Sequence, residues 1–175
     1  MKKIDKKTTL LKDEHGIIYT PYPGEYLIDD IMGLMIKNLS EPYPIYTYRH
    51  FLNNYSDLCI MCFDSNKNEK KEVDNFVAGI IGGIETSNNN VKKGYIAMIA
   101  VKDEYRGKKI AQNIVKLFIE RITKNYDLDE IYLETESDNT AALGLYESLG
   151  FVRVKLNTNY YLNGKSAYKL KLWLK

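Results

Sequence analysis

The chain has 175 residues, of which 45% are hydrophobic and 27% charged, the balance of an ordinary globular protein. Lysine and arginine number 25 against 23 acidic residues, and the resulting net charge of +2 is too small to indicate nucleic-acid binding. No apolar run reaches the ~18 residues of a membrane helix, and none follows the basic start as in a secretory signal. We therefore expect a single domain over residues 1–175, with no membrane segment.

The first half of the chain predicts helices followed by strands. Residues 1–24 are polar and turn-rich, and we expect a short strand or arm there. Apolar residues at helical spacing predict a helix over Glu25–Lys37, and a second helix is expected over Tyr46–Asn54. Prolines between them require a loop. The elements expected next are a strand at Asp57–Asp64, a charged turn at residues 65–74, a strand at Phe76–Glu85 and a hairpin loop at residues 87–90.

Cys59 and Cys62 form a C-x-x-C pair inside the first of these strands. Residues three apart on a strand point to opposite faces, and no second Cys/His pair completes a tetrahedral zinc site. His15 and His50 are isolated in the sequence. We therefore expect two core cysteines and no metal.

The second half predicts a parallel crossover. The nearly wholly apolar segment Gly94–Val101 predicts a strand buried on both faces, and apolar spacing from Ile110 to Ile122 predicts a helix. The elements expected after it are a strand at Asp129–Glu136, a helix capped by Asp138–Asn139 and ended by Gly150, and strands at Phe151–Leu156 and Lys165–Leu174. This order predicts an α/β fold, with a mixed sheet of roughly seven strands and one parallel crossover in its middle.

The polar turn at residues 102–109 joins the apolar strand to the following helix. Backbone N–H groups at a helix N-terminus point outward, and the helix dipole adds about half a positive charge. This arrangement can cradle a pyrophosphate. The plainer interpretation is a solvated basic turn, because Arg106, Lys108 and Lys109 lie close together. Neither the G-x-x-x-x-G-K-[ST] nor the G-x-G-x-x-G motif is present.

Two segments resemble the GNAT acyltransferase superfamily. Val101–Ala111 resembles its R-x-x-G-x-G/A pyrophosphate loop, and Asn139–Phe151 resembles its N-x-A-x-x-L-Y-x-x-L-G-F signature. Further stretches resemble the NatC-type N-terminal acetyltransferases of that superfamily, and together they span most of residues 39–174: residues 39–43, 45–49, 94–98, 133–136, 160–164 and 170–174. The resemblance implies the GNAT fold, acetyl-CoA as co-substrate without a metal, and acetylation of protein N-termini, namely Met followed by a bulky hydrophobic residue.

The resemblance also implies partners and a location. The substrates would be the N-termini of nascent or finished proteins in the cytoplasm, with auxiliary NatC-type subunits and the ribosome as partners and no direct contact with nucleic acid. Two alternatives stay open: acetylation of lysine side chains or small amines on the same fold, and a cofactor-binding domain without turnover. A narrow mouth built from prolines and tyrosines favours a chain terminus over a lysine, and the presence of Glu134 and Tyr146 favours turnover.

The resemblance assigns cofactor contacts to three segments. Backbone groups of Ile99, Ala100 and Val101 would pair with the pantetheine arm, where the central strand parts from its neighbour, and would polarise the thioester carbonyl. The side chains of Ile99 and Val101 would still belong to the core. The other expected cofactor residues are Arg106, Gly107, Lys108, Lys109, Ile110, Ala111, Asn139 and Tyr146.

Two residues are the candidates for proton transfer. Glu134 is the candidate base, acting through water, and Tyr146 is the candidate acid for the departing thiolate. Strand alternation places Glu134 and Glu136 on one face, and we expect the two carboxylates to raise each other's pKa. The plainer interpretations are a core tyrosine and two solvent-facing charges.

The peptide substrate is expected between two loops. Glu41, Pro42 and Tyr43 lie in the first, and Tyr160 and Tyr161 lie in the second; the plainer interpretation of the tyrosine pair is a strand with one buried and one exposed ring. Two departures from the family pattern stand out. Lys109 replaces the usual first glycine of the phosphate loop. Residues 156–159 replace a stretch that usually holds an aromatic residue and arginines, so the substrate preference can differ.

Overall fold

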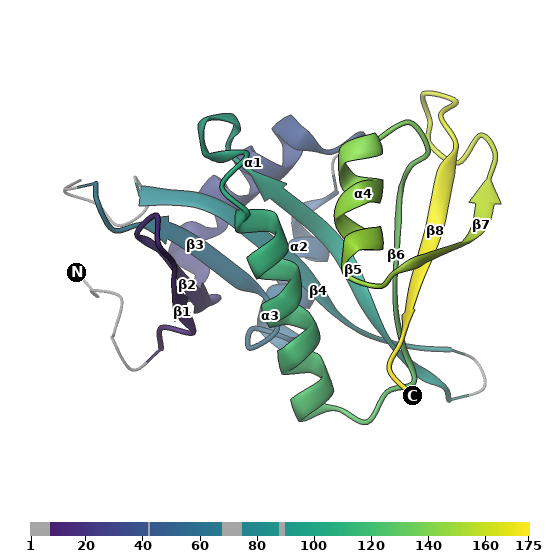
Figure 1. Ribbon diagram of the computed structural model, residues 1–175, viewed down its shortest axis with the longest axis horizontal. Helices are drawn as coiled ribbons and strands as arrows, with labels where there is room; N and C mark the ends of the chain where they lie inside the picture. The colour runs from purple at the N-terminus through teal and green to yellow at the C-terminus, as the bar shows by residue number, and fades with distance from the viewer. Residues whose placement is uncertain (1–7, 42, 68–74, 88–89) are drawn as a thin grey trace.

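The chain folds around one mixed sheet, seen in a computed structural model that describes residues 8–41, 43–67, 75–87 and 90–175. Figure 1 shows the strands crossing the molecule with helices on both faces. The strand order is β1-β2-β3-β4-β5-β6-β8-β7, and every neighbouring pair is antiparallel except β5 and β6. The strands are β1 Leu11–Lys12, β2 Ile17–Pro21, β3 Ile60–Asp64, β4 Phe76–Thr86, β5 Lys92–Val101, β6 Glu130–Glu136, β7 Val152–Asn157 and β8 Ala167–Trp173.

Two pairs of helices cover the two faces of the sheet. Buried residues of α3 (Ile110–Asn125) and α4 (Thr140–Ser148) form one apolar cluster with the sheet, and those of α1 (Ile28–Asn38) and α2 (Ile45–Asn54) form another. As expected, Cys59 and Cys62 are buried free thiols on opposite faces, one in each cluster. No helix in the described part of the chain combines the length and apolar character that a membrane crossing requires.

The expected mixed sheet with its parallel crossover β5–α3–β6 is confirmed, with eight strands instead of roughly seven. The additional strand arises because the N-terminal arm is a hairpin. The carboxylate of Asp13 accepts hydrogen bonds from the N–H groups of His15 and Ile17, at 3.0 and 2.9 Å, and Gly16 completes the turn with a φ of 78°.

Several element ends differ from the predictions. The first helix opens with a 3-10 turn at Glu25–Leu27 before α1 begins. The strand expected from Asp57 begins at Ile60, because the N–H groups of Leu58 and Cys59 donate to the carbonyl of Tyr55 and form a turn. The turn expected at residues 65–74 lies mostly outside the described residues, as does the middle of the hairpin loop at residues 87–90.

Strand β5 carries the feature that positions the site. Its register with β4 shifts by one residue, since Ile81 pairs with Met98 and Gly82 with Ile96. This bulge reverses the alternation: Ile96 packs into the cluster under α3, and Met98 into the cluster under α1 and α2. Position 82 requires glycine, because a Cβ there would collide with the carbonyl oxygen of Tyr95.

Beyond the bulge, β5 and β6 part. Their parallel pairing covers only Gly94 with Ile131 and Tyr95 with Tyr132. In Figure 1 the two strands lie close together near the C-terminus and diverge toward their carboxyl ends, with α4 across the opening. The stretch Ile99–Val101 remains paired with β4 along its other edge. The edge that faces the opening can therefore pair with a ligand.

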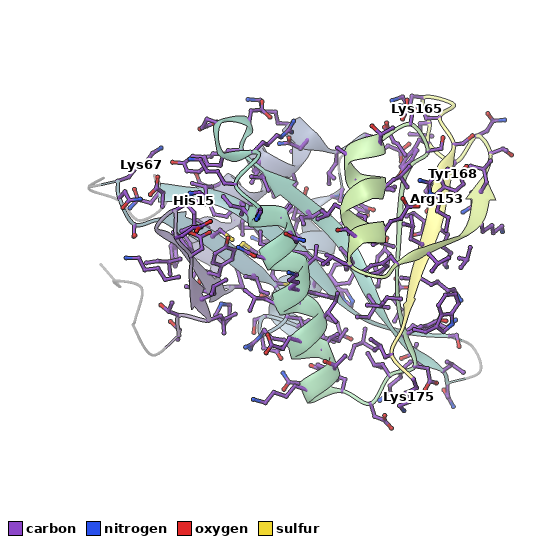
Figure 2. The ribbon with its side chains drawn as sticks, in the orientation of Figure 1. His15, Lys67, Arg153, Lys165, Tyr168 and Lys175 are labelled. Carbon is purple, nitrogen blue, oxygen red and sulfur yellow. The ribbon has the colours of Figure 1, made fainter. Side chains whose placement is uncertain are left out.

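The C-terminal hairpin completes the sheet beside α4. The side-chain oxygen of Asn139 accepts a hydrogen bond of 3.0 Å from the N–H of Ala142 and caps α4, as expected, and Gly150 follows the helix with a φ of 92°. Arg153 on β7 forms an ion pair of 2.6 Å with Glu147 of α4. Its guanidinium carbon lies 4.9 Å from the ring centroid of Tyr168 on β8, and Figure 2 shows the two side chains next to each other.

Candidate active site

A first cavity, of about 490 Å³, lies beside the end of β5 and is called the loop cavity here. Its walls come from β5, the turn that follows it, the start of α3 and one face of α4. All the expected cofactor residues line it except Lys108. The lining residues are Asn38, Ile99, Ala100, Val101, Tyr105, Arg106, Gly107, Lys109, Ile110, Ala111, Gln112, Asn139, Ala141, Ala142, Leu145, Tyr146 and Ser148.

Hydrogen bonds and charges hold the turn of the loop cavity in place. The Tyr105 hydroxyl donates to Oδ2 of Asp64 on β3 at 2.8 Å. Arg106 Nη2 donates to Oδ1 of Asn38 at 2.8 Å and lies 3.0 Å from Asp103 Oδ1. The ammonium group of Lys108 lies 4.9 Å from the ring centroid of Tyr105, and Lys108 itself is not part of the lining. The turn is thus fastened to β3 and α1.

The N-terminus of α3 opens toward this cavity. Lys109 is its N-cap residue, with a left-handed φ of 59°, and it makes no capping side-chain hydrogen bond. Gly107 also has a positive φ, of 76°. The first turn of an α-helix leaves N–H groups without intrahelical partners and carries the positive end of the dipole. This geometry suits an anion, and the left-handed backbone at Lys109 explains why glycine is usual there.

Tyr146 lies on the face of α4 that borders the loop cavity. Its ring is buried and packs edge-on against Phe151, with centroids 5.5 Å apart. Burial raises the pKa of the Tyr146 hydroxyl, which therefore stays protonated at neutral pH. The residue belongs to the core, as its plainer interpretation held, and also lines the cavity.

A second cavity, of about 580 Å³, is called the tyrosine cavity. It contains the expected peptide-binding residues Glu41, Tyr43, Tyr160 and Tyr161; Pro42 lies outside the described residues. Both candidate carboxylates reach it. Its full lining is Lys37, Asn38, Leu39, Ser40, Glu41, Tyr43, Tyr95, Ala97, Glu134, Thr135, Glu136, Asn139, Tyr160 and Tyr161.

The two cavities approach each other from opposite faces of the sheet. Tyr95 and Ala97 of the tyrosine cavity pack on the α1–α2 side, whereas Ile99 and Val101 of the loop cavity pack on the α3 side. Asn38 and Asn139 line both cavities. The parted edge of β5 lies between them, so ligands in the two cavities could meet there.

Contacts of the two loops with each other and with the end of β6 narrow the mouth of the tyrosine cavity. The carboxylate of Glu41 accepts a hydrogen bond from the backbone N–H of Leu162, and the Ser40 hydroxyl donates to Glu136. Lys165, labelled in Figure 2 on the C-terminal hairpin, lies 2.6 Å from Glu136. The rings of Tyr160 and Tyr161 meet edge-on at 5.0 Å, the former half-exposed and the latter partly buried.

Glu134 is the more buried of the two candidate carboxylates. Burial raises its pKa, and the nearby charge of Glu85 on β4 raises it further, while Lys169 on β8 lowers it. The expectation that Glu136 would be the second charge is wrong. The Glu136 carboxylate is instead bonded to Ser40 and Lys165, and β4 brings Glu85 to the group around Glu134.

Sequence reasoning missed several residues of the site. Tyr95 and Ala97 were placed in a buried strand and in the resembling stretch at residues 94–98, but not in the site, although a tyrosine in an otherwise apolar run is a signal. The sequence around Glu85 and Lys169 has no feature that assigns them to the site, since strand pairing brings them to Glu134 from distant segments. Within the described ranges, no group of three or more His, Cys, Asp or Glu side chains is arranged to hold a metal ion.

Known proteins are similar to this chain in sequence and in fold. Residues 28–151 match the family described as "Acetyltransferase (GNAT) family". N-alpha-acetyltransferase 30 of Homo sapiens is 42% identical over 163 residues, which are 93% of this chain and 42% of the human protein. The chain therefore spans less than half of that relative. N-alpha-acetyltransferase 30 of Saccharomyces cerevisiae is 41% identical over 159 residues, covering 89% of this chain and 88% of the yeast protein.

Among solved structures, a chain in the crystal structure of the NatC complex bound to Gag peptide and CoA is similar throughout. It superimposes with a TM-score of 0.83 at 38% sequence identity, covering 91% of this chain and 99% of that chain.

Proposed function

The chain belongs to the acetyltransferase (GNAT) family, with the mixed fold expected of it, and we propose that it transfers the acetyl group of acetyl-CoA to the α-amino group of protein N-termini. One observation carries the proposal. A cavity at the N-terminus of α3 and a cavity with a partly buried carboxylate lie on opposite faces of the sheet and approach each other at the parted edge of β5. The first suits an anionic cofactor and the second an amine.

The loop cavity fits the cofactor. The turn at Arg106–Lys109 and the first N–H groups of α3 form a positive cradle for the pyrophosphate. The unpaired edge of Ile99–Val101 offers backbone groups to the pantetheine arm, as a neighbouring strand would. When bound, acetyl-CoA supplies the acetyl group as an activated thioester. We assign Ile99, Ala100, Val101, Arg106, Gly107, Lys109, Ile110, Ala111, Asn139 and Tyr146 to its binding, with Lys108 contributing through its backbone.

Proton transfer falls to the two groups near the parted strands. Glu134 removes a proton from the incoming ammonium group, directly or through a water, because only the neutral amine is nucleophilic. Its raised pKa brings the carboxylate closer to the pKa of an amine and makes it a better base. Tyr146 holds a proton on its phenolic oxygen for the departing sulfur, since burial keeps the hydroxyl protonated.

The tyrosine cavity favours a chain terminus. The bond between Glu41 and Leu162 joins the two loops over the cavity, and the bond from Ser40 to Glu136 ties the first loop to the end of β6, which leaves a mouth instead of an open groove. Tyr43, Tyr160 and Tyr161 provide apolar walls with polar tips, suited to a large first side chain and its backbone. We propose Met followed by a bulky hydrophobic residue as the preferred N-terminus, which the sequence similarity to the N-alpha-acetyltransferase 30 proteins supports.

We extend the proposal to partners and location. Similarity to a chain of the NatC complex supports auxiliary NatC-type subunits as partners. The ribosome that presents nascent N-termini and a cytoplasmic location are the further parts of this proposal. A single sheet with a core on each face supports one catalytic domain over residues 1–175. We propose no direct contact with nucleic acid, since the net charge is only +2.

Thiol release from acetyl-CoA with a panel of short peptides tests this function. The peptides share one body and differ only in their first two residues: Met-Leu, Met-Phe, Met-Lys and Ser-Leu. We expect kcat/KM to be at least about tenfold higher for the first two than for the others, since burying a large apolar side chain is worth about 1.5–3 kcal/mol. Equal rates across the panel would contradict the preference, and no release with any peptide would contradict the activity.

A further inference from the structure

A lysine outside both cavities contacts the proposed base. Lys169 lies on β8 directly opposite Glu134 in the β6–β8 register. Its Nζ is 3.6 Å from Glu134 Oε1, and the two side chains are 29% and 13% exposed. It does not belong to the lining of the tyrosine cavity and reaches Glu134 from the neighbouring strand β8.

We infer that Lys169 is a positioning residue of the transfer reaction, which holds the Glu134 carboxylate toward β8 and keeps it ionised. The inference rests on the proposed role of Glu134 as base. The physical reason is that a buried carboxylate without a nearby cation takes up a proton and loses its function as a base. An amine at the reacting edge needs the carboxylate in its charged form.

The surroundings of Glu134 leave this task to Lys169. Glu85 of β4 is a like charge, and Tyr132 of β6 and Tyr95 of β5 are neutral. Tyr160 and Tyr161 approach from the C-terminal hairpin. Burial raises the pKa of the hydroxyls of these four tyrosines, so they stay neutral over the working range of pH. Tyr43 completes the group from the loop after α1. Within the described part of the chain, Lys169 is the cation placed against Glu134.

Aromatic and polar contacts fix the position of Lys169. Its Nζ lies 3.9 Å from the ring centroid of Tyr132, a distance at which a cation and a ring attract. The Tyr132 hydroxyl donates to the carboxylate of Glu85, and its ring lies 4.8 Å from that of Tyr95. Contacts from Glu85 of β4 and Tyr95 of β5 thus hold the Tyr132 ring of β6, against which the ammonium group of Lys169 rests. The lysine is therefore held close to Glu134.

The same strand supplies a matched control. Lys171 is two residues further along β8, on the same face, and its Nζ lies 3.0 Å from Glu130 Oε2. Glu130 is buried, and its Oε1 also forms an ion pair of 2.8 Å with Lys93 Nζ. Replacing Lys171 removes the same charge from the same strand without touching Glu134. It separates a specific effect at the base from a general change in the charge of this face.

The test is the titration of the Glu134 carboxyl carbon by NMR in the full chain, with ¹³C-labelled glutamate assigned through Glu134→Gln. In Lys169→Met we expect the pKa of Glu134 to rise by about 1, because one close opposite charge is lost. In Lys171→Met we expect the pKa of Glu134 to remain unchanged. Lys169→Arg should restore the wild-type value. The acidic limb of kcat at saturating peptide should move with the pKa in Lys169→Met, and kcat above that limb should stay within a few-fold of wild type.

An unchanged pKa of Glu134 in folded Lys169→Met would overturn the inference, and so would an equal rise in Lys171→Met. If Lys169→Met does not fold, Lys169→Gln gives the same reading, since it also removes the charge. A rise in the pKa with an unmoved kcat limb would uphold the effect of Lys169 on Glu134 and would instead reject Glu134 as the base. The two failures are therefore distinguishable.

Discussion

Glu134 carries opposing influences on its charge. Burial and Glu85 favour its protonated form, while Lys169 favours the carboxylate. The pKa in the folded chain lies above the ordinary value, so the carboxylate fraction increases as the pH rises through that raised pKa. Because the pKa of Glu134 is higher in the folded chain than in the unfolded chain, its ionisation at neutral pH lowers the free energy of unfolding. A function for this carboxylate explains why the cost is tolerated.

Replacement of this carboxylate tests its role. Glu134→Gln should lower kcat by ~10²-fold or more, and the acidic limb seen in wild type should disappear or move. The thermal midpoint should not fall, because the buried charge is removed and no cavity is created. The measurement is kcat against pH at saturating peptide, since the α-amine itself titrates near ~8. Equal activity of the variant and wild type at all pH values would remove Glu134 from the mechanism.

The phenol of Tyr146 allows a separate prediction. Tyr146→Phe keeps the ring that packs against Phe151 and removes the proton. We expect a loss in kcat of about 10²-fold with the acidic limb retained, because the base is untouched. Steady-state rates across the same pH range check this. Tyr126→Phe, which alters a tyrosine after the end of α3, is the control and should behave as wild type. A Tyr146→Phe variant with full activity would make this residue purely a core tyrosine.

At the scale of elements, β5 determines where the site forms. The apolar run Gly94–Val101 predicts a strand buried on both faces, and both faces do contact a core cluster. The bulge could not be predicted, because every residue from Ile96 to Val101 is apolar and a shifted alternation leaves no trace in such a pattern. Only Gly82, on the partner strand, hints at a close backbone approach.

The turn before α3 and the capped helix α4 were predictable because their signals are local. Gly107, Asn139 and Gly150 stand where a turn, an N-cap and a helix end require them. The grouping of Glu134 with Glu85 and Lys169 was not predictable, because it depends on which strands pair and in which register. Sequence periodicity predicts that a strand exists and does not identify its neighbour.

The left-handed backbone at the start of α3 gives a prediction for this element. Lys109→Gly should raise the free energy of unfolding by about 0.5–1 kcal/mol. A residue with a side chain costs about 1–2 kcal/mol in the left-handed conformation, and the larger conformational entropy that glycine loses on folding offsets part of this gain. Acetyl-CoA binding should stay equal or improve. Denaturant unfolding checks the stability, with Lys108→Gly as control. Position 108 has no positive φ, so glycine there should only destabilise. A loss of stability in Lys109→Gly equal to that of the control would contradict the assigned backbone.

At the scale of the whole molecule, the sheet separates the two ligands. The cofactor would occupy the α3–α4 face and the peptide the α1–α2 face, meeting where β5 and β6 diverge (Figure 1). The apolar cluster under α3 and α4 and the one under α1 and α2 both stabilise the opening between β5 and β6. Folding and cofactor binding should therefore be linked, because only the folded chain forms the loop cavity.

Thermal unfolding measures this linkage. Acetyl-CoA at 100 times its Kd should add about 2.7 kcal/mol of stability and raise the Tm by about 5–10 °C for a chain of this size. Ala111→Leu should reduce the shift, because its side chain lines the loop cavity and would crowd the approach to the phosphates. Without any shift in wild type at saturating acetyl-CoA, the cofactor assignment would fail.

The site of acetylation on a peptide with two different amines shows directly whether the chain acetylates the α-amino group of a terminus or a lysine side chain. The peptide begins with Met-Leu, carries a free N-terminal amine, and has one lysine several residues downstream. After incubation with the chain and acetyl-CoA, tandem mass spectrometry locates the added acetyl group. We expect acetylation of the α-amino group, with the lysine unmodified. Acetyl groups on the lysine, or equally on both amines, would contradict a terminus-selective enzyme.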